Sequence, residues 1–350
     1  MNEQFANKRE GNKSVSVKTN AAVTRPQFNN VRNSLGEVVP LDSPYVIYIE
    51  SSSFCNLECK FCPQHISPDH IVKKNMDLET FKKLINDLLQ FKTKPKVMRF
   101  CGLGDPLFNK QFLEILEYAA ESNAVEKLEL ITNGILLNNK LIPKIVNYLD
   151  RIIISIEGLS SKDYEKYTLR KIDFEKFVQK IELLSKQKSK STIHVKIHNS
   201  AVQTEERKQI FIKTFSKIAD EIFIENLVNL WPEVESNLGL EAGHRFDGGS
   251  LNKVKVCPQI FKSLQINSDG RVIPCCIDWK GLNIVGDVKS ESLNEIWNGK
   301  KLKNLRNRHL KGQRHEFSPC KGCTMNEYSD KDNLDKWADE IYEKINSNNL

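Results

Sequence analysis

Nine cysteines carry most of the chemistry that this 350-residue chain offers. Three of them, Cys55, Cys59 and Cys62, follow the spacing C-x3-C-x2-C. Three thiolates in one short loop can hold an iron–sulfur cube and leave its fourth iron free for a ligand that is not protein. A Cys3His zinc site that uses His65 or His70 is the alternative.

A second cluster lies near the C-terminal end. Four cysteines follow the spacing C-x17-C-x44-C-x2-C, which suits zinc or an iron–sulfur cluster: Cys257, Cys275, Cys320 and Cys323. Cys276 could replace Cys275, but neighbours in a strand point to opposite faces, so we expect only one of the pair to bind. Cys101 remains. It is either a small buried residue or a thiol that donates a hydrogen atom.

The composition is that of an ordinary globular protein, with 39% hydrophobic and 28% charged residues and a net charge of +7. This excludes collagen-like chains, disordered chains and disulfide-rich mini-proteins. No apolar run is long enough to span a bilayer, and the polar, basic first thirty residues do not resemble a signal peptide. We therefore predict a cytoplasmic protein without a membrane partner, in which disulfides are rare and the cysteines serve other purposes.

Strands alternate with amphipathic helices through the middle of the chain. The hydrophobic pattern predicts six strands with helices between them, at residues 45–50, 97–101, 128–132, 151–156, 193–198 and 221–225. Such an α/β pattern indicates a parallel sheet with right-handed crossovers, either doubly wound or a partial (β/α)6 TIM-like barrel. In both folds functional groups gather at the carboxyl ends of the strands. The first cysteine cluster directly follows the first strand.

Three further motifs follow the next three strands. Residues 101–106 read Cys-Gly-Leu-Gly-Asp-Pro, residues 132–134 read Thr-Asn-Gly, and residues 155–158 read Ser-Ile-Glu-Gly. Together with C-x3-C-x2-C and the aromatic Phe61 before its last cysteine, this order resembles the radical S-adenosylmethionine (radical SAM) superfamily. Leu103 and Asp105 depart from the commonest GGEP form, and Glu157 replaces the usual Asp.

The resemblance implies a partial barrel, a [4Fe–4S] cluster on Cys55, Cys59 and Cys62, and SAM at its open iron. In the family, electron transfer from the cluster to SAM yields a 5′-deoxyadenosyl radical, which abstracts hydrogen from substrate. Cofactor-binding residues carried over from the family motifs are Phe61, Gly102, Gly104, Asp105, Asn133, Ser155 and Glu157.

Residues 257–323 resemble the twitch subtype of the SPASM/twitch family, which is a hairpin-and-helix module. That resemblance implies one auxiliary [4Fe–4S] cluster on Cys257, Cys275, Cys320 and Cys323. We expect a polar, disordered tail at 1–40, a radical SAM core at 41–235, the twitch module at 236–330 and a C-terminal helix at 331–350.

Twitch-bearing relatives include a dehydrogenase that oxidises a secondary alcohol of an aminocyclitol. By this resemblance we predict a radical SAM oxidoreductase that oxidises a secondary alcohol of a sugar or cyclitol, with the auxiliary cluster as electron acceptor. The sequence does not identify the catalytic base. Candidates for catalytic groups are Cys101, Cys276, His244 and Arg245.

Three alternatives stay open. An epimerase would need a thiol hydrogen donor, and a maturase of ribosomal peptides often has an added N-terminal domain, where this chain has a short polar tail. A zinc-stabilised binding module would use the basic stretch 300–314. That stretch could also dock an acidic electron donor such as a flavodoxin or ferredoxin. Nucleic acid is not expected, because no aromatic residues interleave with the basic tail.

Overall fold

The computed structural model describes residues 22–23, 33–227, 254–323 and 332–347. Within them, a ten-stranded sheet has the order β1-β7-β6-β5-β4-β3-β2-β8-β9-β10. Its strands are β1 (Ala22–Val23), β2 (Val46–Ile49), β3 (Val97–Phe100), β4 (Lys127–Thr132), β5 (Arg151–Ile156), β6 (Thr192–His198), β7 (Glu221–Glu225), β8 (Ser263–Ile266), β9 (Arg271–Ile273) and β10 (Gly286–Asp287).

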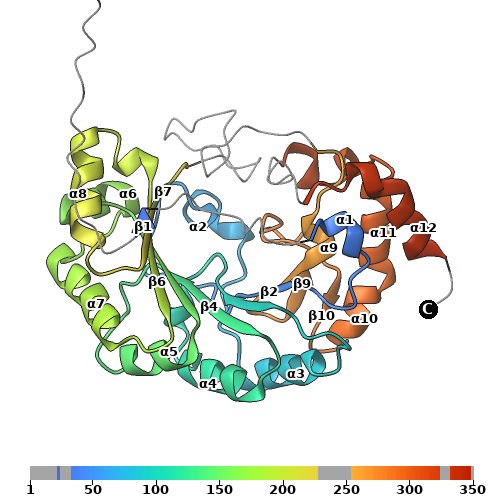
Figure 1. Cartoon of the computed structure of the whole chain (residues 1–350), viewed down its shortest axis with the longest axis horizontal. Coiled ribbons are helices and arrows are strands. Elements are labelled where there is room, and N and C mark those ends of the chain that lie inside the picture. Colours follow the sequence, from blue (N-terminus) through green and yellow to red (C-terminus); the bar gives the residue numbers. More distant parts are fainter. Residues whose placement is uncertain (1–21, 24–32, 228–253, 324–331, 348–350) are drawn as a thin grey trace, which may run out of the picture.

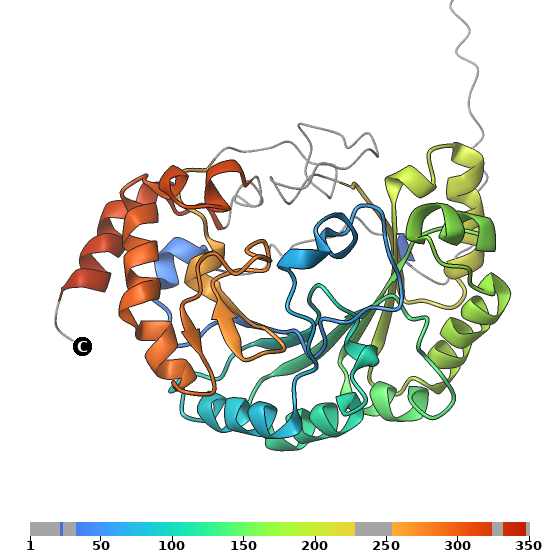
Figure 2. The same ribbon diagram turned by 180° about the vertical axis from the view of Figure 1, so that it is seen from behind.

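The sheet curves, and helices cover its outer face (Figure 1 and Figure 2). The neighbouring strands from β2 to β7 all pair in parallel, so the prediction of a partial (β/α)6 barrel is confirmed. The helices are α1 (Leu35–Val38), α2 (Pro63–Ile66), α3 (Leu78–Leu88), α4 (Phe112–Ser122), α5 (Ile142–Tyr148), α6 (Ser161–Thr168), α7 (Phe174–Gln187), α8 (Glu205–Phe215), α9 (Gln259–Lys262), α10 (Leu293–Asn298), α11 (Lys300–Leu310) and α12 (Ala338–Asn346).

The core lies between the sheet and these helices. In β5, Ile152, Ile154 and Ile156 are almost fully buried, and the residues between them are half-buried. This period of two sends one set of side chains to the helices and the other to the barrel interior. The helix α6 was not predicted, because only three of its eight residues are buried and its apolar pattern is weak.

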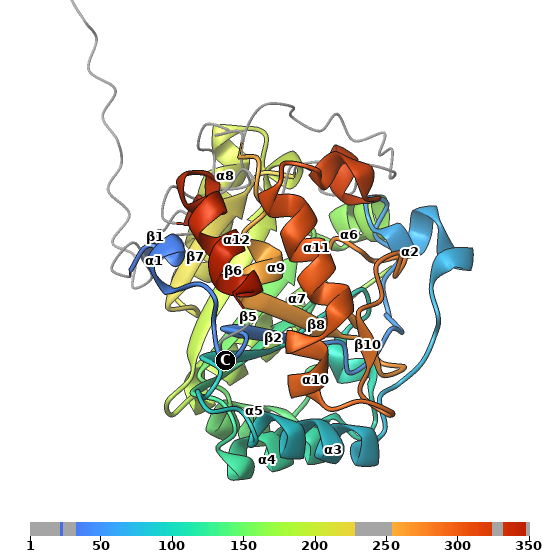
Figure 3. The same cartoon turned by 90° about the vertical axis from the view of Figure 1, so that its right-hand side faces the viewer.

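The strand β8 extends the barrel sheet directly. It pairs in parallel with β2, and it forms the predicted hairpin with β9, which pairs antiparallel. Figure 3 shows the hairpin strand β8 beside β2, with α10 and α11 packed next to it. The module with the second cysteine cluster is therefore joined to the barrel by a main-chain ladder.

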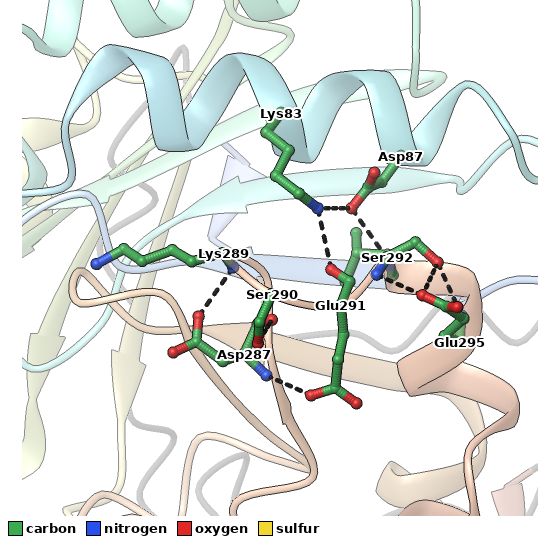
Figure 4. Close-up of polar contacts among 9 residues, drawn as sticks. Lys83, Asp87, Asp287, Lys289, Ser290, Glu291, Ser292 and Glu295 are labelled. Carbon is green, nitrogen blue, oxygen red and sulfur yellow. Dashed lines mark hydrogen bonds and ion pairs between the residues drawn. The ribbon is translucent and has the colours of Figure 1, made fainter.

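Side chains of α3 reinforce this junction (Figure 4). Lys83 Nζ donates to the carbonyl oxygen of Glu291 at 3.0 Å, and Asp87 Oδ2 accepts from the N–H of Leu293 at 3.1 Å. Ser292 caps α10 in a reciprocal pair with Glu295. These contacts fix the start of α10 against the barrel helix α3.

The expected tail is partly structured, which corrects the prediction for residues 33–40. Leu35 and Val39 are buried at 3% and 2% exposure, and a Cβ on Gly36 would lie 2.0 Å from the Trp337 ring. The few apolar residues of this segment thus pack against the C-terminal segment. Its helix α12 spans Ala338–Asn346, within the range 331–350 expected for a C-terminal helix. Residues 1–21 and 24–32 lie outside the described part of the chain.

In the described ranges, no helix combines the length and the apolar character needed to cross a membrane.

Arg306 provides a test of the packing of the C-terminal module. It is buried over the Trp297 ring, 4.0 Å from the centroid, and donates to the carbonyl oxygens of Ile260 and Trp297. Arg306→Met keeps much of the volume but leaves two buried carbonyls without this donor. We expect the free energy of unfolding, measured by urea denaturation, to fall by about 3 kcal/mol. Exposed Lys300→Met is the control, and equal effects of the two variants would contradict this role.

Candidate active site

A cavity of about 280 Å³ lies where the strands of the barrel end. Its wall includes segments that follow β2, β3, β4, β5, β6 and β7. All residues that the sequence assigned to the first cluster and to SAM line it: Cys55, Cys59, Phe61, Cys62, Gly102, Gly104, Asp105, Asn133, Ser155 and Glu157. The strand order thus brings four separate motifs to one place.

The cysteine loop, which follows β2 and carries Cys55, Cys59 and Cys62, is held by main-chain hydrogen bonds. The N–H groups of Glu58 and Lys60 donate to the carbonyl oxygens of Thr168 and Tyr167, and Leu57 is buried. Two donors approach the sulfur of Cys55, namely the Leu57 N–H at 3.5 Å and the Asn133 side-chain amide at 3.6 Å. Such donors to sulfur are typical of iron–sulfur ligands.

The three thiols fit a metal cluster in their electrostatics as well. Burial raises the pKa of each thiol, to about 11 for Cys62. The charges of neighbouring cysteines raise it further for Cys59 and Cys62, and the Asp105 charge raises it further for Cys55. Thiolates packed this closely need a nearby cationic group, which the irons of a cluster supply. His65 and His70, the ligands of the zinc alternative, are exposed and do not line the cavity.

Residues 101–106 form a glycine-rich loop that packs directly against the segment leading into the cysteine loop. A Cβ on Gly104 would lie 2.2 Å from the carbonyl oxygen of Ser52 and 2.5 Å from that of Phe54. Because both atoms are backbone, only glycine permits this approach. The segment can therefore present its own backbone to a ligand in the cavity.

Asp105 lines the cavity, but protein donors already occupy its buried carboxylate. It accepts from Thr132 Oγ1 at 2.8 Å, from the Asn133 N–H at 2.8 Å and from the Leu107 N–H at 3.0 Å. Through these hydrogen bonds Asp105 joins the glycine-rich loop to the end of β4. The Asn133 side chain in turn donates to Asn56 Oδ1 at 3.0 Å in the cysteine loop.

The far wall of the cavity holds polar residues that sequence reasoning missed. Lys196, His198 and Glu225 stand at the ends of β6 and β7, beside Ser155 and Glu157. Lys196 Nζ forms an ion pair with Glu225 Oε2 at 2.6 Å. The available signal was the alternation of polar side chains at positions 194, 196 and 198 in an otherwise apolar strand.

Glu157 and His198 form an unusual pair. The His198 Nε2 lies 3.6 Å from Glu157 Oε2, and neither ring nitrogen has a hydrogen-bond partner among the described residues. The rings of Phe61 and Tyr167 pack against the imidazole. Burial lowers the pKa of His198 to about 4 and raises the pKa of Glu157 to about 7. The imidazole is therefore neutral at physiological pH and can accept a proton.

The cysteines that neither cluster needs lie near each other. Cys101 lines the cavity, and Cys276 acts on it electrostatically from the C-terminal module. Burial raises their pKa values to about 12 and about 11, and the nearby Arg99 guanidinium lowers both. Arg99 is itself held by Glu129 at 2.5 Å. Both thiols are thus protonated at neutral pH.

A second cavity is lined by the four cysteines assigned to the auxiliary cluster: Cys257, Cys275, Cys320 and Cys323. Cys276 lines neither cavity, so Cys275 is the member of the pair that faces this site. Burial raises the pKa of Cys320 to about 12, and the Arg314 charge lowers it. Arg314 also lines the cavity and donates to the carbonyl oxygen of Cys323 at 2.9 Å. These thiols therefore fit one cluster.

Two catalytic candidates from the sequence, His244 and Arg245, lie outside the described residues.

Comparison with known proteins agrees with this geometry. The model of the radical SAM superfamily matches residues 49–207, and that of an iron–sulfur cluster-binding domain, SPASM, matches residues 257–324. The chain thus contains a radical SAM domain followed by a SPASM-type iron–sulfur cluster-binding domain. Its cofactors are SAM, a [4Fe–4S] cluster and an auxiliary iron–sulfur centre.

Among particular relatives, GTP 3′,8-cyclase of Chlorobaculum tepidum is 24% identical over 289 residues, covering 71% of this chain and 83% of the relative. The structure of BtrN with AdoMet and 2-DOIA has a TM-score of 0.54 at 17% identity, covering 82% of this chain and 97% of BtrN. Streptococcus suis SuiB bound to its precursor peptide SuiA has a TM-score of 0.55 at 14% identity, covering 84% and 72%. At these identities the two structures show a shared fold.

Iron content tests the two ligand sets. Anaerobically reconstituted protein should hold about eight irons, as expected of two cubic clusters. Two double variants should each lose one cluster and retain about four irons: Cys59→Ala/Cys62→Ala and Cys320→Ala/Cys323→Ala. Cys276→Ala is the matched control and should keep all of them. Stoichiometric zinc without sulfide would contradict both assignments.

The raised pKa of Glu157 predicts that SAM binding depends on pH. The carboxylate form accepts hydrogen bonds and favours a cationic ligand, and it is lost as pH falls through about 7. SAM affinity, measured by equilibrium dialysis, should fall about fivefold between pH 7 and pH 6 and level off above about pH 8. Glu157→Gln should bind SAM more weakly and lose this slope. An equal slope in the variant would assign the titration to another group.

Proposed function

We propose that this radical SAM enzyme oxidises a secondary alcohol on a small hydroxylated substrate, a sugar or a cyclitol, with the auxiliary cluster as electron acceptor. The observation that carries the proposal is the far wall of the cavity. There a neutral imidazole and an ion pair face the same space as the residues assigned to SAM.

The wall supports a polar substrate. Lys196 offers a donor, Glu225 an acceptor and Ser155 both, and Lys196 and Glu225 are half-buried. Hydroxyl groups can exchange hydrogen bonds with all three, whereas an apolar substrate group would offer them none.

When bound, SAM and the two clusters supply a radical that removes the carbinol hydrogen and an acceptor for one further electron. The residues of this chain must hold the alcohol and take its hydroxyl proton. His198 is the candidate for the second task because its imidazole is neutral and lines the cavity. Glu157, 3.6 Å away, can stabilise the imidazolium that results.

The route between the two sites also favours oxidation. Cys275 faces the second cavity, its neighbour Cys276 acts electrostatically on Cys101, and Cys101 lines the first cavity. The pairing of β8 with β2 joins these segments in one sheet. Electron transfer between the two sites would therefore cross a packed interior.

Epimerisation is a second candidate, because Cys101 lines the cavity as a protonated thiol. Such a thiol can return a hydrogen atom to a substrate radical, and the thiyl must then gain an electron and a proton. An epimerase would incorporate solvent deuterium into its product and lose turnover on Cys101→Ala. Oxidation would yield ketone without deuterium, and the Cys101→Ala variant would still turn over.

We also propose a cytoplasmic location and an acidic electron donor of the flavodoxin or ferredoxin type. Part of the basic stretch is structural, since Arg306 is buried and Arg308 pairs with Glu316. Lys300, Lys301 and Lys311 remain exposed and could contact such a donor. The matches to the radical SAM and SPASM family models do not support the zinc-stabilised binding module considered for the sequence.

Turnover by the reduced enzyme tests the leading proposal. With SAM and a panel of sugars and cyclitols, we expect ketone and 5′-deoxyadenosine in equal amounts. His198→Gln removes the basic nitrogen and should lower kcat about 100-fold while SAM affinity changes little. His194→Gln is the control, because His194 lies on the same strand but does not line the cavity. A mass shift in a peptide substrate, without ketone formation, would instead indicate a maturase.

A further inference from the structure

A carboxylate that the proposed chemistry does not use lies behind the glycine-rich loop. Glu50 follows β2, is 5% exposed and does not line the cavity. Its Oε2 accepts from the backbone N–H of Leu103 at 3.1 Å. Leu103 does line the cavity. Glu50 therefore contacts the loop assigned to SAM binding but does not itself reach the cavity.

The other oxygen of Glu50 binds the auxiliary module. Its Oε1 accepts from the Ser268 hydroxyl at 3.0 Å and from the Ser268 N–H at 3.3 Å. Ser268 is 2% exposed and lies in the turn between β8 and β9, the hairpin that leads to Cys275. One carboxylate therefore joins two segments more than 160 residues apart in sequence.

The fit around this carboxylate is tight. A Cβ on Gly102 would lie 2.6 Å from Glu50 Cγ and 2.9 Å from Oε2, so the loop rests directly on the side chain. Burial raises the pKa of Glu50, and its hydrogen-bond donors oppose that shift by favouring the carboxylate. Breaking any of the three hydrogen bonds to this buried carboxylate costs free energy. A movement of Leu103 should therefore shift Ser268, and a movement of Ser268 should shift Leu103.

We propose that Glu50 is a positioning residue that couples SAM affinity to the auxiliary module through Ser268. The proposal rests on the assignment of residues 101–106 as the loop that contacts SAM. It does not depend on the substrate or on the type of reaction. Coupling of this kind is reciprocal, so SAM must also stabilise the β8–β9 turn.

Equilibrium dialysis of SAM with the reconstituted protein tests the forward effect. Ser268→Ala should weaken SAM binding about fivefold and Glu50→Gln about tenfold, with iron content kept at about eight. Because both act through one contact, the double variant should bind no more weakly than Glu50→Gln alone. Ser290→Ala, an exposed serine of the same module, should leave affinity unchanged.

Hydrogen exchange tests the reverse effect. SAM should slow exchange of the amides at 264–273 in the unaltered protein, and this protection should vanish in Ser268→Ala. An affinity within twofold of normal for Ser268→Ala, or single effects that multiply in the double variant, would overturn the proposal. If Glu50→Gln retains less iron than the unaltered protein, the SAM affinity of Ser268→Ala alone decides whether the proposal holds. Neither measurement uses substrate turnover, so a failure here would leave the proposed oxidation standing.

Discussion

The central constraint of this structure is the position of β2 inside one continuous sheet. It pairs in parallel with β3 on one side and with β8 on the other, over the same four residues. A slip of one residue in either ladder would turn every side chain to the opposite face. The main chain thereby fixes the cysteine loop after β2 relative to both the glycine-rich loop after β3 and the hairpin turn after β8.

Charge imposes a second constraint on both cysteine sites. Burial raises the pKa of six assigned ligand thiols: Cys55, Cys59, Cys62, Cys257, Cys275 and Cys320. Among the described residues, Lys73 lowers the pKa of Cys62, Arg314 and Lys262 lower that of Cys257, and Arg314 lowers that of Cys320. The protein alone therefore holds neutral thiols, and insertion of the irons must release protons. The same burial that protects the clusters makes their assembly dependent on pH.

The sequence was most informative where a motif sits at the end of a regular strand. Period-two patterns located β5 and its neighbours, and the strand ends then placed Cys55, Gly104 and Ser155 at one edge. It could not show that β8 pairs with β2, because long-range pairing leaves no local pattern. His198 was missed for a related reason. Its neutrality and its lack of hydrogen bonds depend on burial by Phe61 and Tyr167, which are distant in the chain.

Cys101 and His198 are two neutral groups on separate walls of the cavity, and each would serve a different reaction of a substrate radical. Cys101 follows β3 and His198 ends β6, with β4 and β5 between them in the sheet. A substrate radical held there can lose an electron and give its hydroxyl proton to His198, or gain a hydrogen atom from Cys101. The first outcome needs the hydroxyl turned toward β6, the second needs the radical carbon turned toward β3. The Lys196–Glu225 pair lies on the β6 side and would draw hydroxyl groups to that wall, which is the arrangement that the proposed oxidation requires.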